Sequence, residues 1–448
     1  MTDALADLPL PPPTSLPPVA TPAGSAGPGA ERPGRAPLPV PRDLPGLSVV
    51  RDPAEGLQVS VRHTLEGAPV PEWRVLAVAA GAPPFCGPDW LIAVHEHLGR
   101  GEPRLVLVRR QGRLLALGAF AALAGPRPLL TFLGAGGSDY ATVLTDPDCG
   151  VSQERLVAAV LDAVVDEVPG ALLDLEQVRV GDLLLEAVDT WAAGREYSVR
   201  RLQQAVVASL RLPDTLAEHE ESLGRHARHE ERRQWRRLAG AGALEVVDDL
   251  LADRPVADVV EELAAVDRAH PHAELRRQPW AGESGRLLAQ VLSTAPRAVV
   301  QLTGIRVDGL LVAYTLCFAG PRALHGYLQS YRAAFAAYGP GALLLLRVRR
   351  RAVGSGYREL DLLRGEEDYK RRLTTRTRRT VRLVLAPAAQ GLVPGVVDRL
   401  SLLRRTYRDE LRRHERLVRR AGVAADTGRR VARVVSTRAG QLRLRRRR

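Results

Sequence analysis

The pattern of apolar and polar positions divides residues 47–385 into strands and helices. Helical spacing of apolar residues with a glycine stop predicts helices, and short β-rich runs flanked by turn residues predict strands. In the first part, the pattern predicts a helix at 88–99, a hairpin at 104–123, a strand entering a glycine-rich bend at 129–144, a helix at 152–168 and a strand at 170–178.

The same order of elements then recurs further along the chain. The pattern predicts a hairpin at 298–320, a strand at 323–331, a glycine-containing loop at 333–341, a helix at 342–356 and a strand at 357–363. The charged stretch 214–242 between the copies reads as two helices, and 249–270 as a further helix. This order predicts an α/β protein in which one unit occurs twice in tandem.

The two ends of the chain differ from this pattern. Residues 1–46 are rich in Pro, Ala and Gly, which predicts a disordered leader, or alternatively a ligand for a proline-reading partner. The net charge is +13, and residues 401–448 hold 17 arginines against four acidic residues, so the excess lies in a basic tail. We expect a helical and then arginine-rich segment at 386–448, which could contact RNA or an anionic surface.

Cysteine usage and hydropathy indicate the compartment. The three cysteines form no CxxC pair, which fits a reduced environment better than a disulfide framework. No apolar run approaches the ~20 residues of a transmembrane helix, and the N-terminus lacks a signal-peptide pattern. We therefore expect a cytoplasmic protein without a transmembrane segment.

Lys370 is unusual because it is the chain's only lysine, against 63 arginines. Lysine is a compact point charge on a narrow stem, whereas arginine is a wide, permanently charged fork. The residue is either a chance survivor of a strong compositional bias or it occupies a position that arginine cannot fill.

The segment around Lys370 resembles a known family. The series hairpin, strand, GPG, helix and strand, ending in "DLLRGEEDYKRR", resembles the acetyltransferases linked to bacterial cellulose biosynthesis, which carry a BioF2-like acetyltransferase domain. That family belongs to the GNAT superfamily and is similar to the FemABX peptidoglycan transferases. The positions that match its motif are Asp361, Leu363, Arg364, Gly365, Glu367, Tyr369 and Lys370.

The match is incomplete in three places. Leu362 and Glu366 replace the Phe and Asp of the motif, and Leu373 stands where an aromatic residue often follows. Weaker likenesses lie in "PPFCGPDWL" (83–91) and "RHEERRQWRRL" (228–238).

The resemblance implies a fold and an activity. It implies two tandem GNAT-like domains, at 47–205 and 206–385, and transfer of an acetyl group from acetyl-CoA to an amine or hydroxyl of a saccharide or cell-envelope precursor. Two alternatives stay open: a FemABX-like aminoacyl transferase that uses charged tRNA, and a non-catalytic nucleic-acid or anionic-surface binder that acts through the basic tail.

Acyl transfer from coenzyme A requires a phosphate site and groups that handle charge and protons at the thioester. The N–H groups of Gly339, Gly341 and Ala342 stand where the GNAT phosphate loop belongs, at a helix start. An ordinary Gly-Pro turn explains the same residues, because only half of the GNAT loop signature is present.

The chemistry is expected at the motif that ends with Lys370. Lys370 would offer its charge to the thioester oxyanion or to a phosphate, Glu366 or Glu367 would be the base, and Tyr369 would protonate the leaving thiolate. The alternative for the two glutamates is a solvated turn. No metal is expected, since His226 and His229 lie in a charged, solvated helix face.

The substrate-binding residues are expected beside this motif. Six of the nine tyrosines fall within 314–369, which predicts a pocket lined by Tyr327 and Tyr331, although strands also favour tyrosine. Arg364 and Asp361 complete the predicted set, with Asp361 orienting its neighbours from within the sheet.

Overall fold

A computed structural model describes residues 47–52, 56–99, 101–125, 128–274, 276, 278–365, 370 and 373–388. The predicted leader and nearly all of the predicted helical and basic tail lie outside these residues. Among the described helices, none combines the length and the apolar character needed to cross a bilayer.

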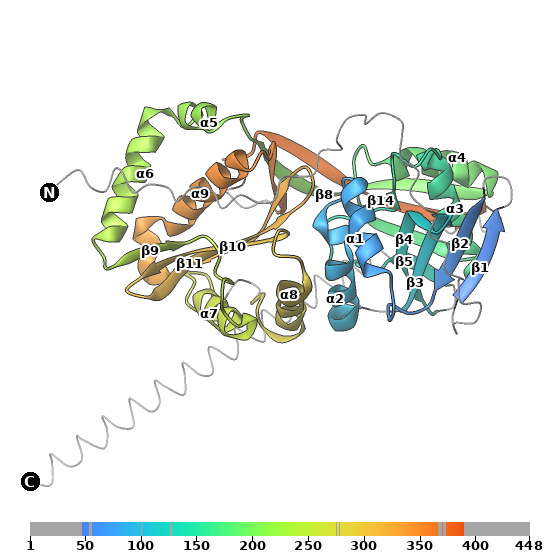
Figure 1. The fold of residues 1–448 in the computed structure, drawn as a ribbon, viewed down its shortest axis with the longest axis horizontal. Helices are drawn as coiled ribbons and strands as arrows, with labels where there is room; N and C mark the ends of the chain where they lie inside the picture. Colours follow the sequence, from blue (N-terminus) through green and yellow to red (C-terminus); the bar gives the residue numbers. More distant parts are fainter. Residues whose placement is uncertain are drawn as a thin grey trace, which may run out of the picture. The chain divides into compact units, whose positions relative to one another are not determined.

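The first α/β unit begins with an antiparallel meander and ends with a helix (Figure 1). Its elements in chain order are β1 (Leu47–Asp52), β2 (Leu57–Arg62), α1 (Val70–Ala79), η1 (Pro84–Cys86), α2 (Pro88–Leu98), β3 (Glu102–Arg110), β4 (Arg113–Leu123), β5 (Leu129–Phe132), β6 (Leu144–Thr145), α3 (Gln153–Glu167), β7 (Leu172–Arg179) and α4 (Leu183–Gly194). The hairpin β3–β4, the strand β5, the helix α3 and the strand β7 confirm the predicted order.

The second unit repeats this order after a helical insertion. Its elements are β8 (Tyr197–Arg211), α5 (Leu216–Ser222), α6 (Gly224–Ala239), β9 (Leu244–Val247), α7 (Val256–Arg268), α8 (Gly282–Thr294), β10 (Val300–Val307), β11 (Leu310–Ala319), β12 (Leu324–Tyr331), η2 (Ala333–Tyr338), α9 (Pro340–Gly354), β13 (Glu359–Arg364) and β14 (Arg376–Pro387). The protein is therefore a mixed α/β fold built from two tandem units of the same kind.

One continuous sheet runs through both units, in the order β1-β2-β3-β4-β5-β7-β14-β8-β13-β12-β11-β10-β9. The last described strand, β14, lies between β7 and β8 and pairs antiparallel with both. The long strands β8 and β14 thus join the units, as Figure 1 shows. The domain boundary at 205/206 stays a prediction; these positions lie within β8.

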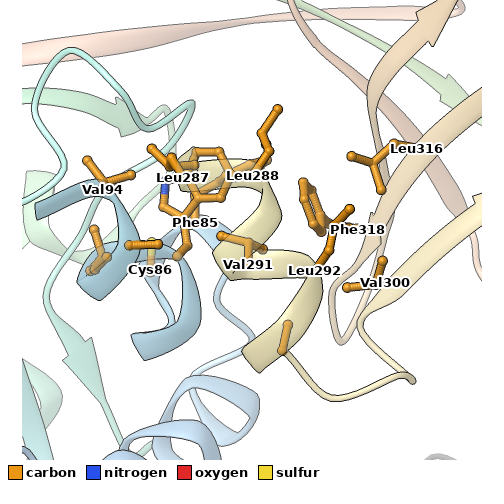
Figure 2. Packing of buried hydrophobic residues seen from close by; sticks show 14 of the residues in the cluster. Phe85, Cys86, Val94, Leu287, Leu288, Val291, Leu292, Val300, Leu316 and Phe318 are labelled. Carbon is orange, nitrogen blue, oxygen red and sulfur yellow. The ribbon is translucent and has the colours of Figure 1, made fainter. Parts of the chain in front are cut away.

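The hydrophobic cores also combine residues from both units. Leu383 and Leu385 of β14 are buried in the core of the first unit, beneath α3. A second core spans the units, since η1 and α2 pack against α8 and β11. Figure 2 shows buried residues of both units in this core, among them Phe85, Leu288 and Phe318. Because both cores draw on distant segments, the units hold each other in place.

Candidate functional site

The parallel strands β12 and β13 separate soon after they meet. They are paired only at Leu324↔Leu360 and His325↔Asp361, although β12 continues to Tyr331. On its other side β13 pairs with β8, with an irregularity between Asp361 and Arg364. An opening between parallel strands at their carboxyl ends is where α/β proteins bind ligands.

The helix α9 begins beside this opening without a side-chain cap. Its N-cap is Gly339, in the left-handed conformation with φ of 64°, and Pro340 follows. The N–H groups of Gly339 and Ala342 donate to backbone carbonyls, of Ala336 and of Gly339 respectively. Of the three predicted phosphate donors, Gly341 is the one whose N–H makes no backbone hydrogen bond to a described residue.

The end of β12 packs directly against this loop. Gln329 Nε2 donates to the carbonyl of Gly341 at 2.5 Å. The Tyr331 ring lies 4.9 Å from that of His270, and a Cβ added at Gly341 would stand 3.5 Å from Tyr331 Cδ1. Tyr331 therefore borders the candidate phosphate loop.

Tyr327 faces a different set of neighbours. Its ring centroid lies 5.3 Å from both Trp90 and Phe318 and 6.0 Å from Phe85. This aromatic cluster is part of the core shared by the two units.

The tyrosines of the predicted pocket lie in different cores. Tyr314 is fully buried, with its hydroxyl bonded to Trp280 Nε1 and Asp267. The described tyrosines of this segment are divided among separate cores: Tyr314 and Tyr327 in one, Tyr331 and Tyr338 in another, and Tyr357 in a third. The described tyrosines thus contribute to three cores, and the pocket lined by Tyr327 and Tyr331 stays a prediction.

Asp361 lies buried on β13 and accepts two hydrogen bonds. Tyr140 OH donates to Oδ2 at 2.6 Å, and Leu363 N–H donates to Oδ1 at 2.7 Å. Burial raises the pKa of Asp361, against the opposing effects of His325 and Tyr140. Burial and the nearby Asp361 carboxylate raise the pKa of Tyr140, and burial lowers the pKa of His325. Asp361 is therefore hydrogen-bonded to its neighbours within the sheet, and its orienting role stays a prediction.

Arg364 and Lys370 meet at the carboxyl end of β13. Arg364 Nε donates to Asp139 Oδ1 at 2.5 Å, and Lys370 Nζ donates to the carbonyl of Arg364 at 2.8 Å. Lys370 is only 6% exposed, which is unusual for a lysine. A buried ammonium held by a carbonyl is a positioned group, unlike a mobile surface lysine.

The other predicted catalytic residues, Glu366, Glu367 and Tyr369, lie outside the described residues. The structure instead adds Asp139, Tyr140 and His325 to the surroundings of Asp361 and Arg364. The sequence carried one usable signal for the first two, because "SDY" directly follows the predicted glycine-rich bend. His325 stood at no recognisable motif.

An apolar cavity of about 290 Å³ lies apart from these groups, between α1, α2 and α8. The charged residues in its lining are Arg74 and Asp89, which form an ion pair with 2.5 Å between Arg74 Nη2 and Asp89 Oδ1. None of the predicted site residues lines it, so we place the candidate chemistry at β12, β13 and α9. Among the described residues, no three His, Cys, Asp or Glu side chains gather as a metal site.

One family model matches part of the chain. Residues 225–371 match the model of the acetyltransferase (GNAT) domain. The match extends from α6 to Lys370 and includes the β12–β13 opening. No curated protein sequence matches the chain.

The solved structure of FemX has a similar fold over most of the chain. FemX is 10% identical, covers 74% of this chain and 98% of its own, and gives a TM-score of 0.53. A tandem GNAT protein from the clavulanic acid biosynthesis pathway is 15% identical, covers 74% and 98%, and gives a lower TM-score of 0.39. The fold is GNAT-like, and the domain match indicates an acyltransferase.

Proposed function

We propose that this protein transfers an acetyl group from acetyl-CoA to an amine or hydroxyl of a saccharide or cell-envelope precursor. The observation that carries the proposal is the opening between β12 and β13, beside a helix N-terminus without a side-chain cap. The unpaired strand edges offer backbone groups to the amides of a pantetheine arm. The N-terminus of α9, with its positive dipole end, suits a pyrophosphate.

In the proposed reaction, the acceptor nitrogen or oxygen attacks the thioester carbon, forming a C–N or C–O bond while the C–S bond breaks. The acceptor's proton passes to a base, for which Glu366 or Glu367 is our candidate, and Tyr369 protonates the departing thiolate. Lys370 stabilises the negative charge that develops on the thioester oxygen. Its place at the end of β13 supports this role, because β13 borders the opening.

Ligands retained by the full chain during native purification test the proposal directly. Native mass spectrometry should detect coenzyme A or acetyl-CoA. Thiol release from acetyl-CoA should then be measured against a panel of amino sugars and saccharide precursors. The proposal would be rejected if the chain retained no coenzyme A, if calorimetry detected no binding of added coenzyme A, and if no thiol were released.

A second candidate, aminoacyl transfer from charged tRNA, is favoured by the position of α6. This helix carries exposed arginines, among them Arg225, Arg232 and Arg236. It lies against the loop before α9: Arg237 stacks 5.5 Å over the Tyr338 ring, and Gln234 lies 3.1 Å from a Cβ added at Gly339. A cationic helix beside a phosphate loop would suit a nucleic-acid backbone.

Charge reversal separates this candidate from the first. The double variant Arg232→Glu, Arg236→Glu should lose tRNA binding in filter assays and keep coenzyme A affinity if tRNA is the donor. Unchanged tRNA binding by the double variant would show that α6 is not the tRNA-binding surface.

We also propose an anionic contact for the basic tail. A chain ending at residue 400 should then bind RNA or anionic vesicles more weakly than the full chain. The full chain's own binding should fall steeply with salt. Equal binding by both chains at low salt would reject this contact.

A further inference from the structure

Two consecutive residues of the first unit reach across to the motif strand of the second. Asp139 accepts from Arg364 Nε at 2.5 Å, and Tyr140 donates to Asp361 Oδ2 at 2.6 Å. The partners are 225 and 221 residues apart in sequence. Asp139, Tyr140 and Asp361 are buried, so neither contact is a loose surface pair.

The segment that these contacts hold has an unfavourable backbone. Leu363 has a φ of 59°, a region that a branched side chain rarely occupies, and it lies in the irregular stretch of β13. Such conformations cost about 1–3 kcal/mol and persist only where the surroundings fix them. Asp361 fixes this one by accepting from Leu363 N–H with one oxygen, while Tyr140 holds the other.

Lys370 depends on the same segment. Its ammonium donates to the carbonyl of Arg364, and the Arg364 side chain is held in turn by Asp139. Asp139 also supplies a negative charge to the Arg364 guanidinium. The position of the ammonium is therefore linked through Arg364 to the first unit.

The bend that carries Asp139 is itself tightly built. The N–H groups of Gly137 and Ser138 both donate to the carbonyl of Gly134. A Cβ at Gly134 would stand 2.1 Å from Ser138 Oγ, so only glycine fits there. Ser138 Oγ in turn accepts from Trp90 Nε1 at 3.0 Å. A rigid support of this kind can hold a partner segment in place.

We infer that Asp139 and Tyr140 are positioning residues for Lys370, so that the first unit contributes to the candidate active site. The catalytic meaning of this inference rests on the proposed function, but the positional claim does not. A displacement of about 1 Å at a reacting centre can cost about 10²-fold in rate. Loss of either contact should therefore lower kcat much more than it changes KM for acetyl-CoA.

The single lysine makes the positional claim measurable without an activity assay. An amine-acetylating reagent can modify only Lys370 Nζ and the N-terminal amine of the full chain. Brief pulses followed by peptide mass spectrometry give both rates, and the N-terminal amine serves as the internal reference. The buried Lys370 should react slowly in the native protein.

Asp139→Asn and Tyr140→Phe should each raise the Lys370 labelling rate by about fivefold or more, because local opening exposes the amine. The matched control is Asp146→Asn, since Asp146 is another buried aspartate of the first unit and pairs with Arg113. Its Lys370 labelling rate should stay unchanged. Asp139→Glu should restore part of the protection.

Unchanged labelling in folded Asp139→Asn and Tyr140→Phe would overturn the inference. An equal rise in the Asp146→Asn control would also overturn it, because general loosening would then explain the effect. Tyr140→Phe removes only a hydroxyl, so it keeps the test decisive if Asp139→Asn is unstable. Labelling that responds as expected in a protein without acyltransferase activity would reject the proposed function and leave the positional link standing.

Discussion

The helices α3 and α9 occupy the same place in the two units, but their N-termini are built differently. Ser152 caps α3 by accepting from Arg155 N–H at 3.2 Å, and Glu154 places a negative charge in the first turn. In α9 the N-cap is Gly339, which has no side chain, and the first turn holds no acidic residue. Of these two helices, α9 is the one whose N-terminus has neither a side-chain cap nor an acidic residue in its first turn.

The strand pairs beside these helices are similar in the two units. The pair β5–β7 has three residue pairs and the pair β12–β13 has two, and in each unit the longer strand runs on past the pairing, to Arg179 in β7 and to Tyr331 in β12. The clearer difference between the two units is therefore the helix N-terminus, which has a side-chain cap in α3 and none in α9.

The largest expected effect is a loss of kcat on replacing Lys370, which follows β13. Lys370→Ala should lower kcat by about 10²–10³, the usual size for loss of one oxyanion donor. Lys370→Arg should be nearly as harmful, because a wide fork does not fit a buried site made for a compact ammonium. Steady-state thiol release measures both variants, with thermal melting as the check on folding.

The first unit provides the matched control. After β7 the chain has Asp182 at the N-cap of α4, where its side chain accepts from Leu184 N–H. Asp182→Asn should keep kcat within about twofold of the native value. Native-like activity in Lys370→Arg would instead show that arginine is tolerated and that Lys370 is a chance survivor.

The next effect should appear at the uncapped helix. Gly341→Val should weaken coenzyme A binding by at least about tenfold, or roughly 1.4 kcal/mol. A Cβ there would stand 2.8 Å from Gln329 Nε2 and block close backbone approach. Calorimetry measures the affinity, and Gly354→Val, at the other end of α9 where a Cβ would meet only Leu216 at 3.8 Å, should bind normally. Native affinity in a folded Gly341→Val protein would place the phosphate elsewhere.

The order of elements could be predicted from sequence because it depends on local periodicity. The helices at 88–99 and 152–168 and the two hairpins were predicted and occur as α2, α3, β3–β4 and β10–β11. The strand β14 was not predicted, since its N-terminal half "RTRRT" is polar. Its role as a bridge between β7 and β8 depends on contacts about 200 residues apart.

The candidate site was predictable only where a motif marked it. The motif located Asp361, Arg364 and Lys370, and the structure brings these three to one end of β13. Asp139 and Tyr140 belong to the other unit, and no periodicity or spacing connects them to residue 364.

Tyr327 and Tyr331 are four residues apart, and strict alternation would place them on one face of β12. They pack in different cores, and the register of β12 against β11 shifts beside Tyr327, between Leu316 and Cys317, which the sequence did not reveal.

Lowering the pH should reduce the stability of the second unit more than that of the first. In the second unit, burial lowers the pKa of three histidines, His219, His270 and His325, and that of His270 falls to about 4. Among the described histidines of the first unit, burial lowers only the pKa of His95. A histidine that stays neutral when folded stabilises the protein above the ordinary pKa near 6.5. That stabilisation is lost as pH falls below it.

Hydrogen exchange at pH 7.5 and 5.5, corrected for intrinsic rates, measures this difference. At the lower pH, amides of β10–β12 should lose about tenfold more protection than those of β3–β5. A tenfold loss is expected because one such histidine changes the folding equilibrium constant by about a factor of ten for each pH unit below its ordinary pKa. His325→Phe should reduce the difference. Equal loss in both units would contradict it.

The smallest effect tests whether the cap of α3 is purely structural. Ser152→Ala removes the hydroxyl that accepts from Arg155 N–H, so the free energy of unfolding should fall by about 1 kcal/mol. Urea unfolding measures this loss, and Ser152→Thr, which keeps a capping hydroxyl, should restore most of it. Coenzyme A affinity should stay unchanged in Ser152→Ala, because α3 is not expected to hold the pyrophosphate. If Ser152→Ala weakened coenzyme A binding as much as Gly341→Val, the ligand would lie at α3 and the contrast between the two helix N-termini would be wrong.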